Sequence, residues 1–129
     1  MLFRSRKRVD RGEKTQLFRL MKQFGRTRLT SGVWARALDE GDAMAHDLID
    51  RAVDALGTGI ASTINLMDIG TVIIGGGLGI RLGQPYADRI AEAMKPHLFL
   101  PDRAPEVKVA ALGDLGGAIG AALLVGAAA

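Results

Sequence analysis

The strongest chemical signal in the chain is a glycine cluster at residues 75–79 (GGGLG). It follows residues 71–74 (TVII), a β-branched run that predicts a strand buried on both faces. Glycines at the carboxyl end of a parallel strand can take positive φ and let a ligand lie against bare backbone. A nucleotide is the ligand we expect. The pattern matches neither the dinucleotide motif nor the P-loop, so a simple tight turn is the alternative.

A second glycine-rich segment, residues 113–120 (GDLGGAIG), lies where a predicted strand meets the last predicted helix. Backbone amides at the start of that helix can face an anion. The alternative, which we favour, is that Asp114 caps the helix while Gly116, Gly117 and Gly120 allow close helix packing.

The titratable residues do not suggest catalysis. His46 and His97 have no further ligands near them in the sequence, and a metal site needs three or four converging ligands. Asp47, Asp50 and Asp54 share one face of a predicted helix, where solvated surface charge explains them more simply than acid–base chemistry. We therefore predict no nucleophile, no general base and no metal site.

Basic residues are concentrated at the start of the chain. Residues 1–30 carry 10 Lys and Arg against two carboxylates, a net charge of +8, whereas residues 31–129 carry 7 against 12, a net charge of −5. Such a block can be a nucleic-acid arm, yet it lacks interleaved aromatic residues and a helix-turn-helix pattern. We favour a solvated basic face, or one that docks on an acidic partner, over a nucleic-acid partner.

Length and composition indicate one compact domain, because 129 residues that are 48% apolar can bury a core without staples. The chain has no cysteine, which excludes a disulfide framework and thiolate metal sites. The longest apolar run, residues 115–129, has 15 residues, fewer than the roughly 20 of a membrane span. The basic N-terminus lacks the apolar stretch of a secretory signal, so we expect a cytoplasmic protein.

Hydrophobic periodicity predicts helices over residues 15–24 and from residue 31 to about residue 41. A longer helix follows, capped by Asp42. Gly57 and Gly59 lie inside this helix, where each costs about 1 kcal/mol relative to alanine. We therefore expect a strand of a sheet to approach the helix backbone there.

The second half of the chain predicts a helix over residues 84–94, a strand over residues 107–112 and a final helix over residues 115–125. This order of elements implies an α/β fold with a parallel sheet and right-handed crossovers. Two strands make a poor sheet. Either strands are missed, or the rest of the sheet lies in another polypeptide segment.

Four motifs occur in order along the chain. They are residues 34–38 (WARAL) with 41–42 (GD), residues 56–61 (LGTGIA) with 65–66 (NL), residues 72–77 (VIIGGG), and residues 111–114 (ALGD) with 117–122 (GAIGAA). Each motif is common alone, but four in this order are fairly specific. Together they resemble the C-terminal half of ROK-family proteins, which are bacterial sugar kinases, including glucokinases, and related repressors.

The resemblance implies the C-terminal lobe of an actin-like, hexokinase-type ATPase fold. In it, Gly75, Gly76 and Gly77 would form the adenosine-binding turn, and the intact enzyme would use ATP with Mg²⁺ to phosphorylate a hexose, with glucose expected first. The family's N-terminal phosphate loop, its catalytic base and its cysteine-rich zinc motif have no counterpart here. We therefore expect an inactive fragment whose partners are a missing N-terminal lobe and further copies of the chain.

On this interpretation, residues 1–30 form a basic segment with a short helix, and residues 31–129 form the α/β lobe. Residues 2–5 (LFRS) resemble the translation of a sequencing adapter, which gives the hypothesis that the first residues are not native. Two alternatives to a kinase stay open: the sugar-sensing part of a ROK repressor, and an independent small α/β binding module. Polyphosphate stays open as the phosphoryl donor.

Overall fold

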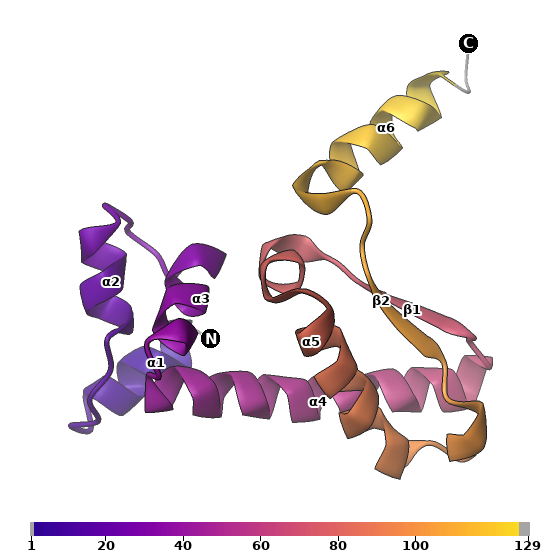
Figure 1. Ribbon diagram of the computed structural model, residues 1–129, viewed down its shortest axis with the longest axis horizontal. Coiled ribbons are helices and arrows are strands. Elements are labelled where there is room, and N and C mark those ends of the chain that lie inside the picture. The colour runs from indigo at the N-terminus through magenta and orange to yellow at the C-terminus, as the bar shows by residue number, and fades with distance from the viewer. Residues whose placement is uncertain (1, 127–129) are drawn as a thin grey trace.

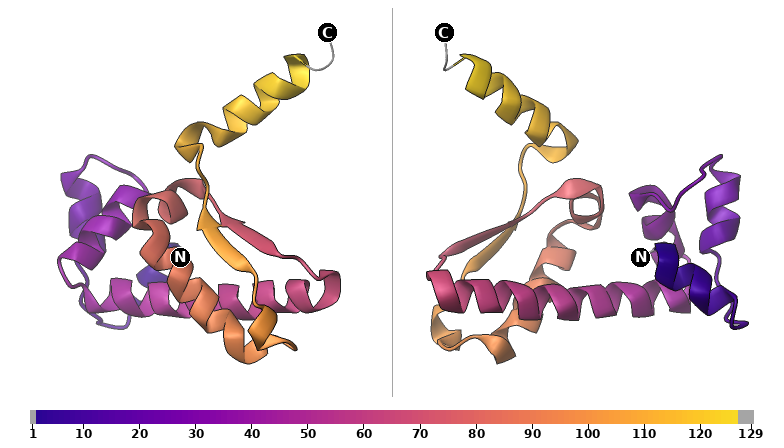
Figure 2. Two further views of the ribbon diagram at one scale, coloured as in Figure 1. Left: turned by 45° about the vertical axis from the view of Figure 1, so that its right-hand side comes forward. Right: turned by 180° about the vertical axis from the view of Figure 1, so that it is seen from behind.

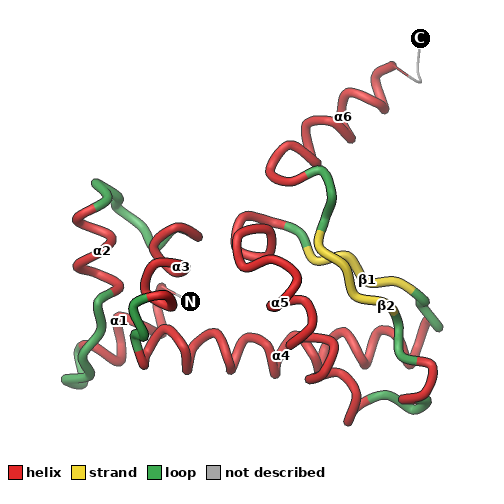
Figure 3. Tube along the Cα trace, viewed as in Figure 1, coloured by secondary structure: helices red, strands yellow, loops and turns green. Residues whose placement is uncertain are grey.

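The computed structural model describes residues 2–126 and has an α/β architecture (Figures 1 and 3). Among these residues the helices are α1 (Leu2–Val9), α2 (Leu17–Gln23), α3 (Ser31–Asp39), α4 (Ala43–Met67), α5 (Gly76–Met94) and α6 (Gly116–Gly126). The strands are β1 (Thr71–Ile74) and β2 (Glu106–Val109). Single turns of 3-10 helix are η1 (Lys95–His97), η2 (Pro101–Arg103) and η3 (Gly113–Leu115). The expected short parallel sheet flanked by helices is confirmed.

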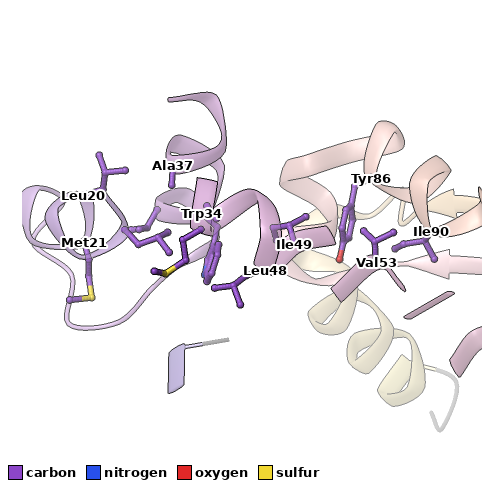
Figure 4. Packing of buried hydrophobic residues seen from close by; sticks show 13 residues of the cluster. Leu20, Met21, Trp34, Ala37, Leu48, Ile49, Val53, Tyr86 and Ile90 are labelled. Atoms are coloured by element: carbon purple, nitrogen blue, oxygen red, sulfur yellow. The ribbon is translucent and has the colours of Figure 1, made fainter. Parts of the chain in front are cut away.

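Helix α4 is the longest element, and its first half forms the centre of the main core (Figure 4). Asp42 caps the helix as predicted, because its Oδ1 accepts a hydrogen bond from Ala45 N at 2.8 Å. The core joins four helices through Leu17, Leu20, Met21, Val33, Trp34, Ala37, Met44, Ala45, Leu48, Ile49, Val53, Tyr86 and Ile90. Helix α2 thus packs in the same core as α3, while the domain boundary expected after residue 30 stays a prediction.

The basic segment contains a helix, α1, that the sequence analysis does not predict, because this segment is short and four of its eight residues are basic. Arg8 on α1 donates to Glu13 at 2.8 Å and also pairs with Asp47 on α4. The hydrogen bond from Arg8 holds the pKa of Glu13 below its usual value. An ion pair between Arg8 and Asp47 therefore connects α1 to the long helix.

The two strands pair in parallel, with Thr71 opposite Glu106 and Ile74 opposite Val109. Helices α4 and α5 cover the face that carries Val72 and Ile74. The opposite face is open, and the Ile73 side chain is 66% exposed. The prediction that this strand is buried on both faces is therefore wrong for the described chain, because only one sheet face has helices against it.

Helix α5 begins earlier than predicted, at Gly76 and not near residue 84. Its two parts meet at Gly83, where φ is 66° and ψ is −160°. Pro85 follows this break and so lies in the first turn of the second part, as expected. Apolar periodicity identified only this second part, because residues 76–83 include four glycines.

The neighbour of Gly57 is a helix and not the expected strand. A Cβ on Gly57 would lie 2.7 Å from the carbonyl carbon of Ala93 on α5, so the missing side chain lets α4 and α5 cross closely. At Gly59 a Cβ would meet nothing within 4 Å. The expected close approach therefore occurs at the first glycine only.

Helix α6 stands away from the other elements in all three views (Figures 1 and 2). It is apolar on every side, and Leu124 and Val125 are each 76% exposed. A helix that is apolar all round is normally buried. No helix within residues 2–126 is both long and apolar enough to cross a membrane.

Candidate functional site

The predicted glycine turn lies where β1 leads into α5, at the carboxyl end of the strand (Figure 1). Gly75 is the N-cap of the helix, and Gly76 has a φ of 78°, the positive value expected for this turn. No side chain in the described part of the chain caps the start of α5. The first backbone N–H groups of the helix are therefore free to donate at the edge where open α/β sheets bind ligands.

Each glycine of the turn meets different surroundings. A Cβ on Gly79 would lie 2.8 Å from Cγ2 of Ile74, so glycine there lets α5 pack back on β1. A Cβ on Gly77 would lie 3.3 Å from Oγ of Ser31, at the start of α3. A Cβ on Gly76 would meet nothing within 4 Å. The turn therefore packs against the protein at Gly77 and Gly79 and is open at Gly76.

An open groove of ≈ 440 Å³ runs along the turn. It is lined by residues 73–79 together with Leu56 of α4 and Tyr86 of α5. Burial raises the pKa of the Tyr86 phenol, so this group is neutral at pH 7. The groove thus combines apolar walls with backbone donors, which suits an aromatic base with hydrogen-bonding edges. None of its lining side chains exchanges a proton near neutral pH.

The other titratable residues lie apart from this groove and in ordinary surface roles. Asp47 pairs with Arg8 and Arg51, and Asp50 pairs with Arg89, as expected for surface charge. Within residues 2–126, no three His, Asp or Glu side chains come close enough to hold a metal ion. The described part of the chain therefore contains no cluster of side chains arranged for acid–base catalysis or metal binding.

The histidines make isolated contacts. His46 Nε2 lies 3.2 Å from the carbonyl oxygen of Leu38, and His97 Nε2 lies 3.3 Å from Oγ1 of Thr58. Among the described residues, each histidine makes one such side-chain contact and has no set of metal ligands around it.

The second glycine segment forms η3 and the start of α6. Gly113 has a φ of 56°, which suits glycine. Cβ atoms on Gly117 and Gly120 would meet nothing within 4 Å, so the close helix packing expected there does not occur among the described residues. The expected cap concerns the Asp114 side chain, which lies outside the described residues.

Leu56 and Tyr86 are groove residues that the sequence did not reveal. Both have helical apolar spacing, which predicts core positions and does not distinguish a groove wall from a core. Tyr86 is the only tyrosine of the chain, and its side chain does border the main core. A buried aromatic residue that also reaches a groove can be recognised only from the fold.

Comparison with known proteins gives a consistent family. The ROK family model matches residues 19–128. N-acetyl-D-glucosamine kinase of Salmonella typhi is 34% identical over 86 residues, which are 67% of this chain and 28% of that protein. The chain thus spans less than a third of this curated relative.

Two solved structures have a similar fold. The ROK hexokinase of Thermus thermophilus has a TM-score of 0.60 and 31% identity, over 80% of this chain and 35% of that one. A putative sugar kinase of Cytophaga hutchinsonii has a TM-score of 0.69 and 22% identity, over 95% of this chain and 38% of that one. The second likeness concerns the fold alone. The family match, the relatives and the fold agree, and the chain belongs to the ROK family.

Proposed function

We propose that this chain is the nucleotide-side, C-terminal part of an ATP-dependent hexose kinase with an actin-like ATPase fold. Gly75, Gly76 and Gly77 form the turn that receives the adenosine. The observation that carries this proposal is the groove, because it places uncapped helix amides and apolar walls together at the carboxyl end of a parallel strand. The kinase names of the relatives favour this function over the sugar-sensing part of a repressor.

The exposed apolar surfaces of β1 and α6 support the proposal that this chain is part of a larger protein. Among residues 2–126 the sheet has two strands, one of its faces is open at Ile73, and no other described element covers the apolar side chains of α6. A sheet this narrow is normally part of a wider one. An N-terminal lobe, which the chain lacks on this proposal, would cover these surfaces and form the other wall of the cleft.

The side chains present indicate which steps of the reaction this chain would perform and which the other lobe would perform. Phosphoryl transfer depends on holding donor and acceptor in line and on neutralising the phosphates. The groove has no carboxylate among its lining residues, so it does not fit Mg²⁺, and the ion that accompanies ATP would be held elsewhere. The chain's own residues would bind and orient the base and ribose. The base that accepts the sugar proton would come from the other lobe.

The nucleotide assignment can be tested in a full-length parent enzyme with Gly76→Val. The backbone at this position has positive φ, so a β-branched residue would distort the turn that faces the adenosine. We expect KM for ATP to rise about tenfold while KM for the sugar is unchanged. Gly59→Ala, on the exposed side of α4, is the matched control. An unchanged KM for ATP would refute the assignment.

The fragment proposal can be tested with the chain alone. We expect no phosphorylation of glucose or N-acetylglucosamine, and ATP binding no tighter than roughly millimolar, about 4 kcal/mol. A coupled assay of the chain alone, and of the chain mixed with an N-terminal half, measures phosphorylation, and isothermal titration calorimetry of the chain with ATP measures binding. Turnover by the chain alone would show that a catalytic base exists within it. We further propose that the intact enzyme is cytoplasmic.

A further inference from the structure

A hollow between α1 and α4 is lined almost entirely by basic side chains. Its volume is ≈ 230 Å³, and its lining consists of Arg4, Lys7, Arg8, Arg11 and Arg51 together with Leu48. None of the described residues that line it is acidic. We call this site the basic hollow. Several cations around one hollow attract an anion, and the proposed function uses none of these residues.

Helix α1 gathers basic side chains on the face that borders the hollow. Positions 4, 7, 8 and 11 have the spacing of one helical face. The helix ends at Val9, but the turn after it keeps Arg11 beside Arg8, because the backbone N–H of Arg11 donates to the carbonyl oxygen of Arg8 at 3.1 Å. Arg6 belongs to another face and lines a separate hollow. The basic hollow is therefore distinct from the general positive charge of the segment.

Two carboxylates hold the arginines on both walls of the hollow in place. Arg8 Nε donates to Glu13 at 2.8 Å, and Nη1 of the same side chain pairs with Asp47. Asp47 also lies 3.6 Å from Nε of Arg51, so one carboxylate joins the arginine of α1 to the arginine of α4. The two guanidinium groups are thus oriented before a ligand binds, which lowers the entropic cost of binding.

The other three cations have no such carboxylate. Arg4, Lys7 and Arg11 make no ion pair with another described residue. Like charges in one hollow repel one another, and an anion between them would remove this repulsion. Arg4 is one of residues 2–5, which resemble a translated adapter, but the hollow keeps four basic residues without it.

We propose that the basic hollow binds a small anion that carries a phosphate group, either inorganic phosphate or a phosphomonoester. A guanidinium group can donate to two phosphate oxygens at once, which a lysine cannot do. The volume of the hollow is below the roughly 300–1,000 Å³ of sites for drug-sized ligands, so it suits a phosphate with a small substituent. Leu48 gives the lining one apolar side chain against which such a substituent can lie.

The basic hollow and the groove at the glycine turn lie on different sides of α4. Helix α1 lies on one side of α4 and α5 on the other (Figures 1 and 2). Arg51 lines the hollow and Leu56 lines the groove, and these positions are about 140° apart around the helix axis. A phosphate in the hollow therefore leaves the proposed adenosine site free, and the inference does not depend on the proposed kinase function.

The first test is isothermal titration calorimetry of the purified chain with inorganic phosphate at low ionic strength. We expect one saturable site, with affinity lowered about tenfold in Arg11→Gln, because charge-assisted hydrogen bonds to the phosphate are lost. Arg6→Gln removes the same charge from the same segment outside the hollow and should leave the affinity nearly unchanged. Equal losses in the two variants would overturn the proposal, as would a wild type that does not bind phosphate.

Arg51→Gln tests the wall that α4 provides. Its side chain is largely exposed and its ion pair with Asp47 is long, so the substitution should hardly change the melting temperature. The affinity for phosphate should nevertheless fall about tenfold, as in Arg11→Gln. An unchanged affinity in a folded Arg51→Gln variant would overturn a site between the two helices.

Glycerol 3-phosphate distinguishes the two sources of the phosphate group, with glycerol as the control that should not bind. Tighter binding of glycerol 3-phosphate than of inorganic phosphate supports the proposal and assigns a phosphomonoester. Equal or weaker binding also supports it and assigns inorganic phosphate. Saturable binding of single-stranded DNA, without binding of either phosphate compound, would overturn the proposal in favour of a nucleic-acid surface.

A footprint locates the bound phosphate on the chain. Lys7 lines the basic hollow, whereas Lys14 and Lys22 are exposed outside it. Saturating phosphate should cause loss of acetylation at Lys7 by an N-hydroxysuccinimide ester and leave Lys14 and Lys22 unchanged, as measured by peptide mass spectrometry. Equal protection of the three lysines, or no protection of Lys7, would overturn the proposal.

Discussion

The two halves of α4 carry similar apolar sequences but lie in different surroundings. In the first half, Leu48, Ile49 and Val53 are buried against neighbouring helices (Figure 4). Near the end of the second half, Leu66 is 85% exposed, and beyond the helix β1 exposes Ile73. Both halves repeat apolar residues at helical spacing. What differs is how much of each half the described chain covers, because Ala61 and Ile64 in the second half are buried against α5 and the sheet while Leu66 stays exposed.

An apolar side chain stabilises a fold only where it leaves water, by about 25 cal/mol for each Å² of apolar area buried. Helices α2, α3 and α5 provide that burial for the first half of α4. The open face of β1 and helix α6 have no equivalent among the described elements. The open face of β1 and helix α6 should therefore add little to the stability of the isolated chain, and they should gain most from a binding partner.

The largest expected effect compares two isoleucines. Ile49 is completely buried, so Ile49→Ala should lower the free energy of unfolding by about 2–5 kcal/mol through lost burial and a cavity. Ile73→Ala should change it by less than about 0.5 kcal/mol, because the side chain is already exposed. Urea denaturation followed by circular dichroism measures both. Equal losses would mean that the open face of β1 is covered in solution.

The next effect concerns the anchored start of α4. Asp42 accepts hydrogen bonds from Ala45 N, from Thr15 Oγ1 at 2.9 Å and from Gln16 N at 2.5 Å, so it joins the start of α2 to the long helix. Asp42→Ala should destabilise the chain by about 2–3 kcal/mol, because these groups lose a charged acceptor. Asp42→Asn keeps an acceptor oxygen and should cost less. Equal losses would show that charge, and not the cap, matters.

Two glycines within α4 give a smaller effect of opposite sign. Gly57→Ala should destabilise the chain by about 1–2 kcal/mol, because its Cβ would collide with the backbone of Ala93. Gly59→Ala should stabilise it by about 0.5–1 kcal/mol, because the position is open and alanine favours a helix. Thermal denaturation of both variants measures the difference. A stabilising Gly57→Ala would mean that the two helices are not in close contact.

The sequence predicts the elements whose signals are local. The long helix and its Asp42 cap follow from apolar spacing and a capping residue, and the strand at residues 71–74 follows from a β-branched run. The position of the glycine turn and the positive φ of Gly76 follow from the same segment.

Features that depend on distant parts of the chain could not be predicted in this way. A β-branched run does not reveal whether one sheet face or both are covered, and so the exposure of Ile73 was not foreseen. A glycine in a helix indicates a close neighbour without identifying it, and at Gly57 the neighbour is Ala93 on another helix. The groove walls at Leu56 and Tyr86 likewise arise only when α4, β1 and α5 come together.

The smallest expected effect concerns Tyr86, which lies between the filled core and the open groove. Burial raises the pKa of its phenol above the usual value of about 10. The unfolded chain then loses the proton at lower pH than the folded chain. The contribution of Tyr86 to the free energy of unfolding is therefore fully present below about pH 10. It declines as the pH rises through the pKa of the folded chain.

Because Tyr86 is the only tyrosine, the ultraviolet absorbance of tyrosinate reports this residue alone. We expect the folded chain to titrate at higher pH than the urea-unfolded chain. The melting temperature of the wild type should also fall more steeply above about pH 10 than that of Tyr86→Phe, whose side chain has no proton to lose. If the folded and unfolded chains titrate identically, the Tyr86 phenol is exposed to water in the groove. Tyr86 would then belong to the open groove and not to the buried core.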